Sequence, residues 1–160
     1  MKATYKVRRA TRRELPSCER APGDAIALGP RGIIMATLYD AETVWTNIAG
    51  VKVEMEDQYC LGTGVMKTIL VGSILDAKPY FFDIIQSSGQ SYRAKSISER
   101  RDVLQNALRV LGDIFCAIEP PRIDRGYIPA FDRICKEGGA GIIVLREDEK
   151  YPIFFENMEK

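Results

Sequence analysis

The chain has 160 residues, of which 46% are hydrophobic and 28% charged, and its formal net charge at pH 7 is +1. This length and composition are typical of one soluble globular domain with a core of its own. The sequence contains no histidine, which excludes histidine general bases, Ser-His-Asp or Cys-His nucleophiles and most transition-metal sites. Its four cysteines form no CxxC pair, so we expect no metal, and we expect no cofactor.

Charge is spread unevenly along the chain. Six of the 23 basic residues lie within the first 13 positions, where no acidic residue occurs. The remainder of the chain therefore has 17 basic and 22 acidic residues. The six are Lys2, Lys6, Arg8, Arg9, Arg12 and Arg13. A basic arm of this kind indicates phosphate contact, but a solvated edge strand protected by its cations explains it equally well. No apolar segment follows the arginines and no window could span a membrane, so we expect a cytoplasmic protein.

The first half of the sequence predicts mainly strands, because short apolar or alternating runs are bounded by glycine, proline or aspartate. The predicted strands cover residues 3–9, 32–40, 43–50, 51–57 and 79–85. Residues 10–30 hold three prolines and two glycines and predict a loop with at most one helical turn. A tight turn at Asp40–Glu42 joins two of the strands. Residues 66–77 fit a short helix, with a strand as the alternative.

Two helices are predicted in the second half. Ser96 with Glu99 forms a capping box, and an apolar stripe follows it at three- and four-residue steps. The stripe consists of Ile97, Leu104, Leu108, Leu111 and Phe115. A shorter helix begins near Pro129 and ends at Gly138–Gly139, before a central strand over 141–147 and a last one over 151–157. The fold class is therefore α+β, with mixed, largely antiparallel sheets and two packed helices.

The segment "FFDIIQSSGQSYRAKSISERRDVL" resembles part of the adenylation domain of ATP-dependent DNA ligases and, more widely, of the covalent nucleotidyltransferases that include RNA ligases and mRNA capping enzymes. It matches their Phe-Asp strand, glycine turn and helix entered by "ERR". The stretches "TLYDAETVW", "SILDAKP" and "GGAGIIVLRE" lie where that superfamily has Lys-x-Asp-Gly, Asp-Gly-Glu and Glu-Gly-x-Val-x-Lys. The resemblance implies a ligase-adenylation-like, ATP-grasp-like core over residues 31–160, preceded by a basic strand, arm and loop over 1–30.

The catalytic residues of that superfamily are missing at the matched positions. There a lysine amine attacks the nucleotide α-phosphate, and the resemblance places this lysine at Leu38. The aspartate of the motif is kept as Asp40, while its glycine is Ala41. In the second motif Asp76 is kept, but the glutamate is Lys78, whose charge would repel the divalent cation that the reaction needs.

The third motif has Ala140 in place of its glutamate and Leu145 in place of its lysine, and the final Lys-x-Lys motif has no clear match. The resemblance therefore implies a degenerate domain that is not an enzyme by this mechanism. Phe82 matches the aromatic residue that stacks on the purine, which leaves a purine-binding remnant or, more commonly, a plain core residue. Arg100 and Arg101 are expected on the polar side of their helix, either at phosphates or in solvent.

Three functions remain open. The first, which we favour, is a catalytically inactive nucleic-acid-binding module for DNA or RNA, with the basic arm, Arg100 and Arg101 at phosphates. Its stacking surfaces would be Tyr5, Tyr39 and Trp45. The second is a protein-interaction or assembly module, as partner or homo-oligomer, that uses Phe154–Phe155. The third is a nucleotidyltransferase with a relocated lysine, at Lys52, Lys67 or Lys78. Stripped enzymes of this kind resemble viral or phage products, which is the origin we expect.

Overall fold

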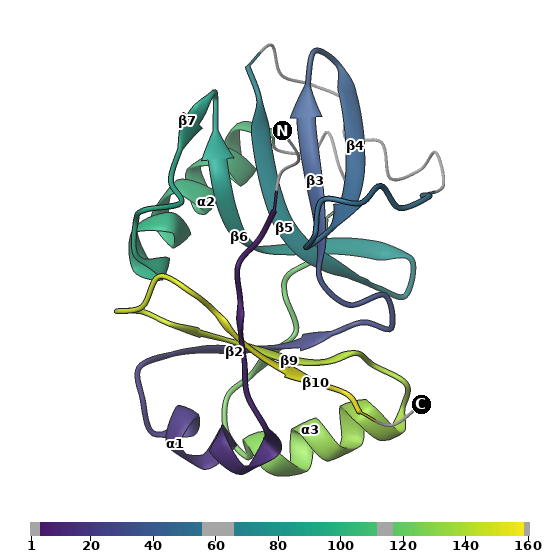
Figure 1. The fold of residues 1–160 in the computed structure, drawn as a ribbon, viewed down its shortest axis with the longest axis vertical. Helices are drawn as coiled ribbons and strands as arrows, with labels where there is room; N and C mark the ends of the chain where they lie inside the picture. The colour runs from purple at the N-terminus through teal and green to yellow at the C-terminus, as the bar shows by residue number, and fades with distance from the viewer. Residues whose placement is uncertain (1–3, 56–65, 112–116, 159–160) are drawn as a thin grey trace.

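The computed structural model describes residues 4–55, 66–111 and 117–158, which form two five-stranded sheets and three α-helices (Figure 1). Sheet A consists of β1 (Arg8–Arg9), β2 (Gly23–Leu28), β8 (Arg122–Ile123), β9 (Gly141–Arg146) and β10 (Ile153–Glu156). Sheet B consists of β3 (Ile34–Tyr39), β4 (Glu42–Asn47), β5 (Thr68–Leu75), β6 (Lys78–Ser87) and β7 (Gln90–Ser91). The helices are α1 (Leu15–Glu19), α2 (Ile97–Leu111) and α3 (Tyr127–Lys136), and a short 3-10 helix, η1 (Arg12–Glu14), precedes α1.

The strands run in the order β1-β10-β9-β2-β8 in sheet A and β4-β3-β5-β6-β7 in sheet B. Every pairing between these strands is antiparallel except that of β1 with β10. This arrangement confirms the prediction of an α+β fold with mixed, largely antiparallel sheets. None of the described helices is long and apolar enough to cross a membrane.

Three apolar clusters divide the molecule into layers. One cluster fills the space between the inner faces of the two sheets, which stand one above the other in Figure 1. A second lies between sheet B and α2, and a third lies between sheet A and the pair α1 and α3. The order of layers is therefore α2, sheet B, sheet A, and then α1 with α3.

Local sequence signals set several of these elements. The backbone N–H of Glu99 donates to Ser96 Oγ at 3.3 Å, which confirms the capping box at the start of α2. Ile97, Leu104 and Leu111 are buried along α2, and Phe115 lies outside the described residues. Asp40 and Ala41 have φ of 50° and 65°, so β3 and β4 meet in the predicted tight turn, of the mirror-image type that suits two-residue hairpins.

Four predicted segments differ from the structure. The predicted loop over 10–30 contains η1, α1 and the whole of β2, because pairing with β9 stabilises an apolar run too short to be recognised alone. The predicted strand over 3–9 is reduced to β1. Residues 66–77 contain β5 rather than a helix, since a strand buried on both faces also places apolar residues three and four apart. Within residues 51–55 there is only one isolated bridge, between Lys52 and Thr46, and 56–57 lie outside the described residues.

The chain passes from sheet A to sheet B through residues 29–32, which we call the crossing loop. The N–H of Gly29 donates to Ser73 Oγ and to the Tyr80 hydroxyl, both at 3.2 Å. Ser73 Oγ in turn donates to the carbonyl of Gly32 at 2.7 Å. A Cβ on Gly29 would lie 1.8 Å from the carbonyl oxygen of Ile74, so only glycine fits there.

We expect Gly29→Ala to lower the free energy of unfolding by about 3 kcal/mol, because the crossing loop must move away from β5 to make room for the methyl group. Urea denaturation measures this change. Gly138→Ala is the control, since a Cβ there meets no atom within 4 Å, although the φ of 90° costs some strain. Equal losses in the two variants would contradict the close approach at Gly29.

Candidate functional site

The position matched to the family's nucleophile does not face the space between the sheets. Leu38 is buried in the cluster between sheet B and α2, whereas Phe82 and Leu145 belong to the cluster between the sheets. These two clusters lie on opposite faces of sheet B, so the side chains of Leu38 and Phe82 also point to opposite faces of that sheet. The structure thus separates the predicted nucleophile position from the predicted purine-stacking residue.

The two aspartate turns are also far apart. Leu38, two residues before Asp40, pairs with Thr68 at one end of β5, whereas Asp76 follows Leu75 at the other end. At about 3.3 Å per residue, the length of β5 separates the turns by roughly 23 Å. Asp76 and its neighbour Lys78 are exposed in the β5–β6 turn. These positions therefore do not form one site with Asp40 and Ala41.

The residues that do meet are at the crossing loop. The N–H of Ala140 lies 3.2 Å from the carbonyl oxygen of Leu28 and 3.3 Å from that of Gly29, so the matched glutamate position sits beside this loop. The Tyr80 hydroxyl donates to the carbonyl of Ala27. Burial raises the pKa of Tyr80, which keeps its hydroxyl protonated and able to donate. The sequence analysis missed this loop, although its two glycines, three residues apart in "GPRG", were a signal.

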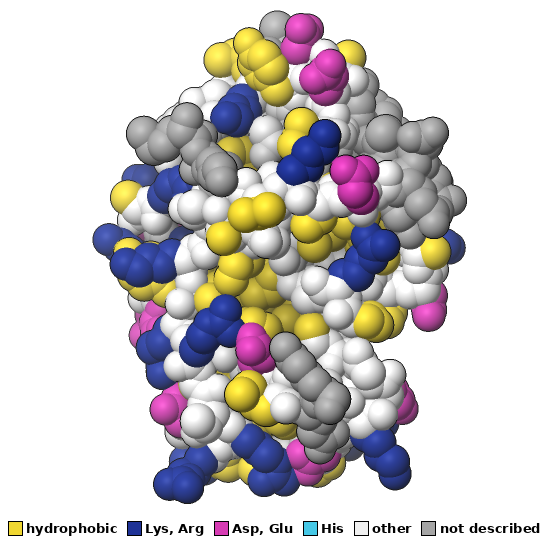
Figure 2. All heavy atoms as spheres, turned by 45° about the vertical axis from the view of Figure 1, so that its right-hand side comes forward, with side chains coloured by type: hydrophobic (Ala, Val, Ile, Leu, Met, Phe, Trp, Pro, Cys, Tyr) yellow, Lys and Arg dark blue, Asp and Glu magenta, His cyan; other side chains and the backbone are white. Residues whose placement is uncertain are grey.

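A cavity of about 420 Å³ opens beside the crossing loop. Figure 2 shows that this side of the molecule, where the two sheets meet, is hollowed and that apolar side chains lie in the hollow with polar ones around it. Its charged lining residues are Arg31 and Glu156, and no lysine lines it among the residues that the structure describes. Arg31 donates to the carbonyl of Glu54 at 3.2 Å, and Glu156 pairs with Arg9. Both charges therefore already have partners.

Phe82 lines a second cavity, of about 390 Å³, between α2 and sheet A. Only 6% of the Phe82 surface is exposed, and its ring packs in the cluster between the sheets, as a core residue does. At the same cavity Arg101 pairs with Asp24 at 3.0 Å and with Glu147 at 3.4 Å. Arg101 thus joins α2 to sheet A through two carboxylates.

The predicted basic arm is bound to the body of the protein. Residues 4–14, which we call the strap, run from sheet B across sheet A to α3 (Figure 1). The N–H of Tyr5 donates to the carbonyl of Ile48, just after β4, at 2.9 Å, and that of Arg8 donates to the carbonyl of Pro152, just before β10, at 2.8 Å. Lys2 lies outside the described residues.

Most cations of the strap have partners. Lys6 lies over the ring of Tyr151, at 4.9 Å from its centroid. The arginine pairs are Arg8 with Glu14, Arg9 with Glu156 and Arg12 with Asp132. The hydrogen bonds from Arg12, at 2.8 and 2.7 Å, lower the pKa of Asp132. Arg13 alone among the described arginines of the strap is exposed without an ion pair.

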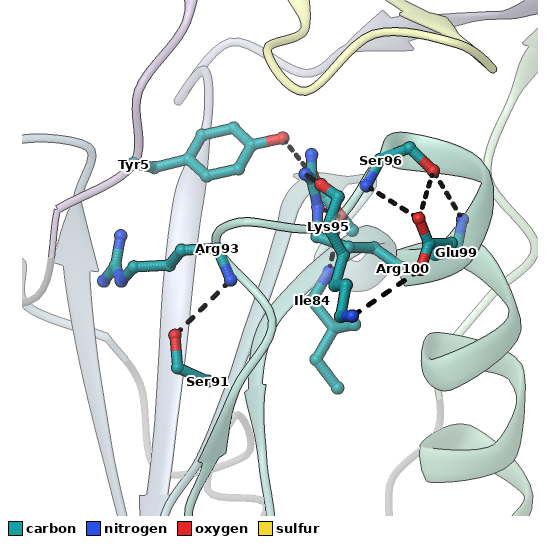
Figure 3. A network of polar contacts seen from close by, with 9 residues as sticks. Tyr5, Ile84, Ser91, Arg93, Lys95, Ser96, Glu99 and Arg100 are labelled. Atoms are coloured by element: carbon teal, nitrogen blue, oxygen red, sulfur yellow. Dashed lines mark hydrogen bonds and ion pairs between the residues drawn. The ribbon is translucent and has the colours of Figure 1, made fainter.

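Arg100 is not on the polar side of α2, and this prediction is wrong. Its side chain is 3% exposed and forms a bidentate pair with Asp83, with both N···O distances 2.9 Å. The Tyr5 hydroxyl donates to the same carboxylate at 2.6 Å. Figure 3 shows the Tyr5 hydroxyl directed toward the start of α2, which carries Arg100. Arg100 lies three residues after Ile97 and four before Leu104, on the buried stripe of α2. That spacing was the signal that the sequence analysis missed.

Burial, together with the charge of Asp83, raises the pKa of Tyr5 well above its usual value. For Arg100, burial alone would lower the pKa, but the hydrogen bonds and charge of Asp83 outweigh it and raise the pKa. Both groups therefore stay protonated as donors to Asp83. Phe154, Phe155 and Trp45 are also buried, which removes the predicted apolar interface and one predicted stacking surface. Tyr5 is likewise unavailable for stacking, and Tyr39 remains 55% exposed.

No protein-family model matches the chain, and no curated protein matches it. Solved structures do. A mycobacterial DNA ligase D complexed with ATP and MES superposes with a TM-score of 0.62 at 14% identity, over 98% of this chain and 60% of that one. The ligase domain of the Mycobacterium tuberculosis enzyme gives 0.58 at 14% identity, over 98% and 59%. An apo RNA ligase mutant from Naegleria gruberi gives 0.51 at 12% identity, over 97% and 56%.

The chain therefore has the fold of the adenylation domains of ATP-dependent DNA ligases and their RNA ligase relatives, as the sequence resemblance predicted. It spans about 60% of the length of the DNA ligase chains. Identities this low show the fold alone, because one fold carries many functions.

We expect Asp83→Ala to lower the free energy of unfolding by about 3–5 kcal/mol, because it leaves Arg100 buried without a counter-charge. Tyr5→Phe should cost less, about 2 kcal/mol, since it removes one hydrogen bond to the carboxylate. Urea denaturation measures both. Asp102→Ala, at an exposed position of α2, should change stability by less than about 0.5 kcal/mol. An Asp83→Ala loss as small as that of the control would contradict the structural role of the network.

Proposed function

We propose that the chain is a catalytically inactive protein of the ligase adenylation fold that binds nucleic acid. The observation that supports catalytic inactivity is the packed apolar core between the two sheets. Phe82, Leu145 and Phe154 pack there with residues of both sheets, and no lysine lines either cavity beside the sheet interface among the described residues. A nucleotidyl transfer by this mechanism needs an amine at the α-phosphate.

The absence of the nucleophile does not depend on one placement of the motifs. The pattern Lys-x-Asp-Gly can also be placed on residues 29–32 at the crossing loop, where only its glycine is kept, as Gly32, while Gly29 and Arg31 replace its lysine and its aspartate. The pattern Asp-Gly-Glu can also be placed on residues 71–73, where only its glycine is kept, as Gly72, while Val71 and Ser73 replace its aspartate and its glutamate. Because Ser73 contacts the crossing loop, this second placement brings the motifs together. Both placements lack the lysine and the glutamate.

A relocated nucleophile has less support. Lys52 and Lys78 are exposed, and Lys67 is half-buried. None of the three lines either cavity beside the sheet interface among the described residues. A lysine that attacks a bound nucleotide must lie within reach of it in a site that excludes water. We therefore favour the inactive reading.

Nucleic acid is the partner that best matches the fold and the charges together. The similar structures are named as DNA and RNA ligases, and the chain keeps most of the length of their shared fold. Among the described residues, Arg13 of η1 and Arg133 and Lys136 of α3 are exposed cations without an ion pair. Phosphate contacts by such cations give binding that depends on salt more than on sequence.

Fluorescence anisotropy with labelled single- and double-stranded DNA and RNA tests this proposal. We expect a Kd on the order of 1–100 μM near physiological salt that falls steeply at lower salt, as for non-specific phosphate binding. Incubation with labelled ATP or GTP and Mg²⁺, followed by mass spectrometry, should give no covalent adduct. A nucleotide covalently bound to a lysine would overturn the claim that the protein is catalytically inactive. A lack of binding to every polymer at low salt would overturn the claim that it binds nucleic acid.

A further inference from the structure

We propose that the end of the molecule formed by η1, α1 and α3 binds single-stranded nucleic acid. This inference rests on the proposed function and assigns it a surface. We call this surface the basic end and define it by five exposed cations that have no ion pair among the described residues: Arg13, Arg20, Arg125, Arg133 and Lys136.

Two contacts bring these cations onto one surface. The carboxylate of Glu19, at the end of α1, accepts the N–H groups of Gly126 and Tyr127 at 3.1 and 2.7 Å. This places Arg20 and Arg125 together at the start of α3. The pair between Arg12 and Asp132 places η1 against the middle of α3. Arg13 therefore lies near the second half of α3, which carries Arg133 and Lys136.

The acids of this region are mostly engaged already. Glu14 pairs with Arg8, Asp132 pairs with Arg12, and Glu19 caps α3. The hydrogen bonds from Tyr127 and Gly126 lower the pKa of Glu19, which keeps it ionised in that role. Asp124 and Glu137 are the remaining acids beside five cations without partners. Figure 2 shows several Lys and Arg side chains at this lower end of the molecule, with Asp and Glu side chains among them.

The spacing of the cations suits a polyanion. The ten residues of α3 extend for about 15 Å, which is longer than the distance between neighbouring phosphates of a nucleic-acid strand. Cations at both ends of α3 and along its side can therefore meet successive phosphates of one strand. A compact anion such as a single phosphate would reach only one end.

A groove beside the basic end favours a single strand over a duplex. It has a volume of about 700 Å³ and lies between the strap, α3 and β10. Its walls combine Phe131, Phe154 and Met158 with Lys136 and with the ion pairs Arg9–Glu156 and Arg12–Asp132. An unpaired base of a single strand can turn out of the stack and enter the groove while the phosphates of the strand contact the cations. The bases of a duplex are paired and stacked inside it and cannot enter the groove.

Two variants of equal charge test the surface. One changes Arg13, Arg133 and Lys136 to alanine. The matched control changes Lys52, Lys78 and Arg109 to alanine, three exposed cations of sheet B, its flanking segment and α2. We expect the first variant to raise the Kd for a labelled single-stranded 12-mer at least tenfold. Its salt slope should fall by about two, because three phosphate contacts are lost. The control should change the Kd less than twofold.

The outcomes separate this inference from the proposed function. If the wild-type protein binds no polymer, the proposed function fails. If it binds a polymer but the control variant loses as much affinity as the first variant, the basic end is not the binding surface, whereas the proposed nucleic-acid binding is retained. Thermal melting of both variants confirms that each is folded.

Two ligands test the groove and the chemistry of the partner. An abasic 12-mer should bind several-fold more weakly than the normal strand, and equal affinity would overturn the entry of a base. Labelled polyglutamate of equal charge should bind more weakly than the strand. Equal binding would identify the basic end as a surface for acidic proteins and overturn the assignment to nucleic acid.

Discussion

The carboxylate of Asp83 holds three parts of the molecule in place. It lies in β6, it accepts two hydrogen bonds from Arg100 of α2, and it accepts a third from Tyr5 at the start of the strap. A buried ion pair of this kind contributes little net free energy, yet the loss of one partner is costly. The network therefore acts as a unit that fixes the strap against sheet B and α2. From there the strap pairs with β10 and reaches α3.

This network explains why the basic start of the chain is not a free arm. Tyr5 anchors the strap in the core, and the arginines that follow meet Glu14, Glu156 and Asp132 on the way to α1. Exposed pairs of this kind contribute little to stability, but together they neutralise charge that would otherwise face solvent. The exposed cations without an ion pair are instead those of the basic end, where most neighbouring acids already have ion-pair or hydrogen-bond partners. The distribution of charge in space thus differs from its distribution along the sequence.

In this chain a packed core fills the space between the two sheets. Here apolar residues of both inner faces meet, and the crossing loop is tied to sheet B through Ser73 and Tyr80. The ligase-like arrangement of strands is kept by these contacts and by Gly29, which allows the loop to approach β5. Retention of the fold is therefore compatible with the replacement of catalytic residues by packing residues, as the proposed function requires.

The sequence by itself determined the elements whose signals are local: the capping box and stripe of α2, the turn at Asp40, α3 before its glycines, and the strands β9 and β10. It also determined the α+β class, because the order of those elements carries the resemblance to ligases. Only the tertiary structure decided which face of sheet B Leu38 occupies, that Arg100 is buried against Asp83, that β2 forms, and which cations lack partners. These features depend on residues up to 147 positions apart, such as Arg9 and Glu156, and no local pattern specifies which distant side chains will meet.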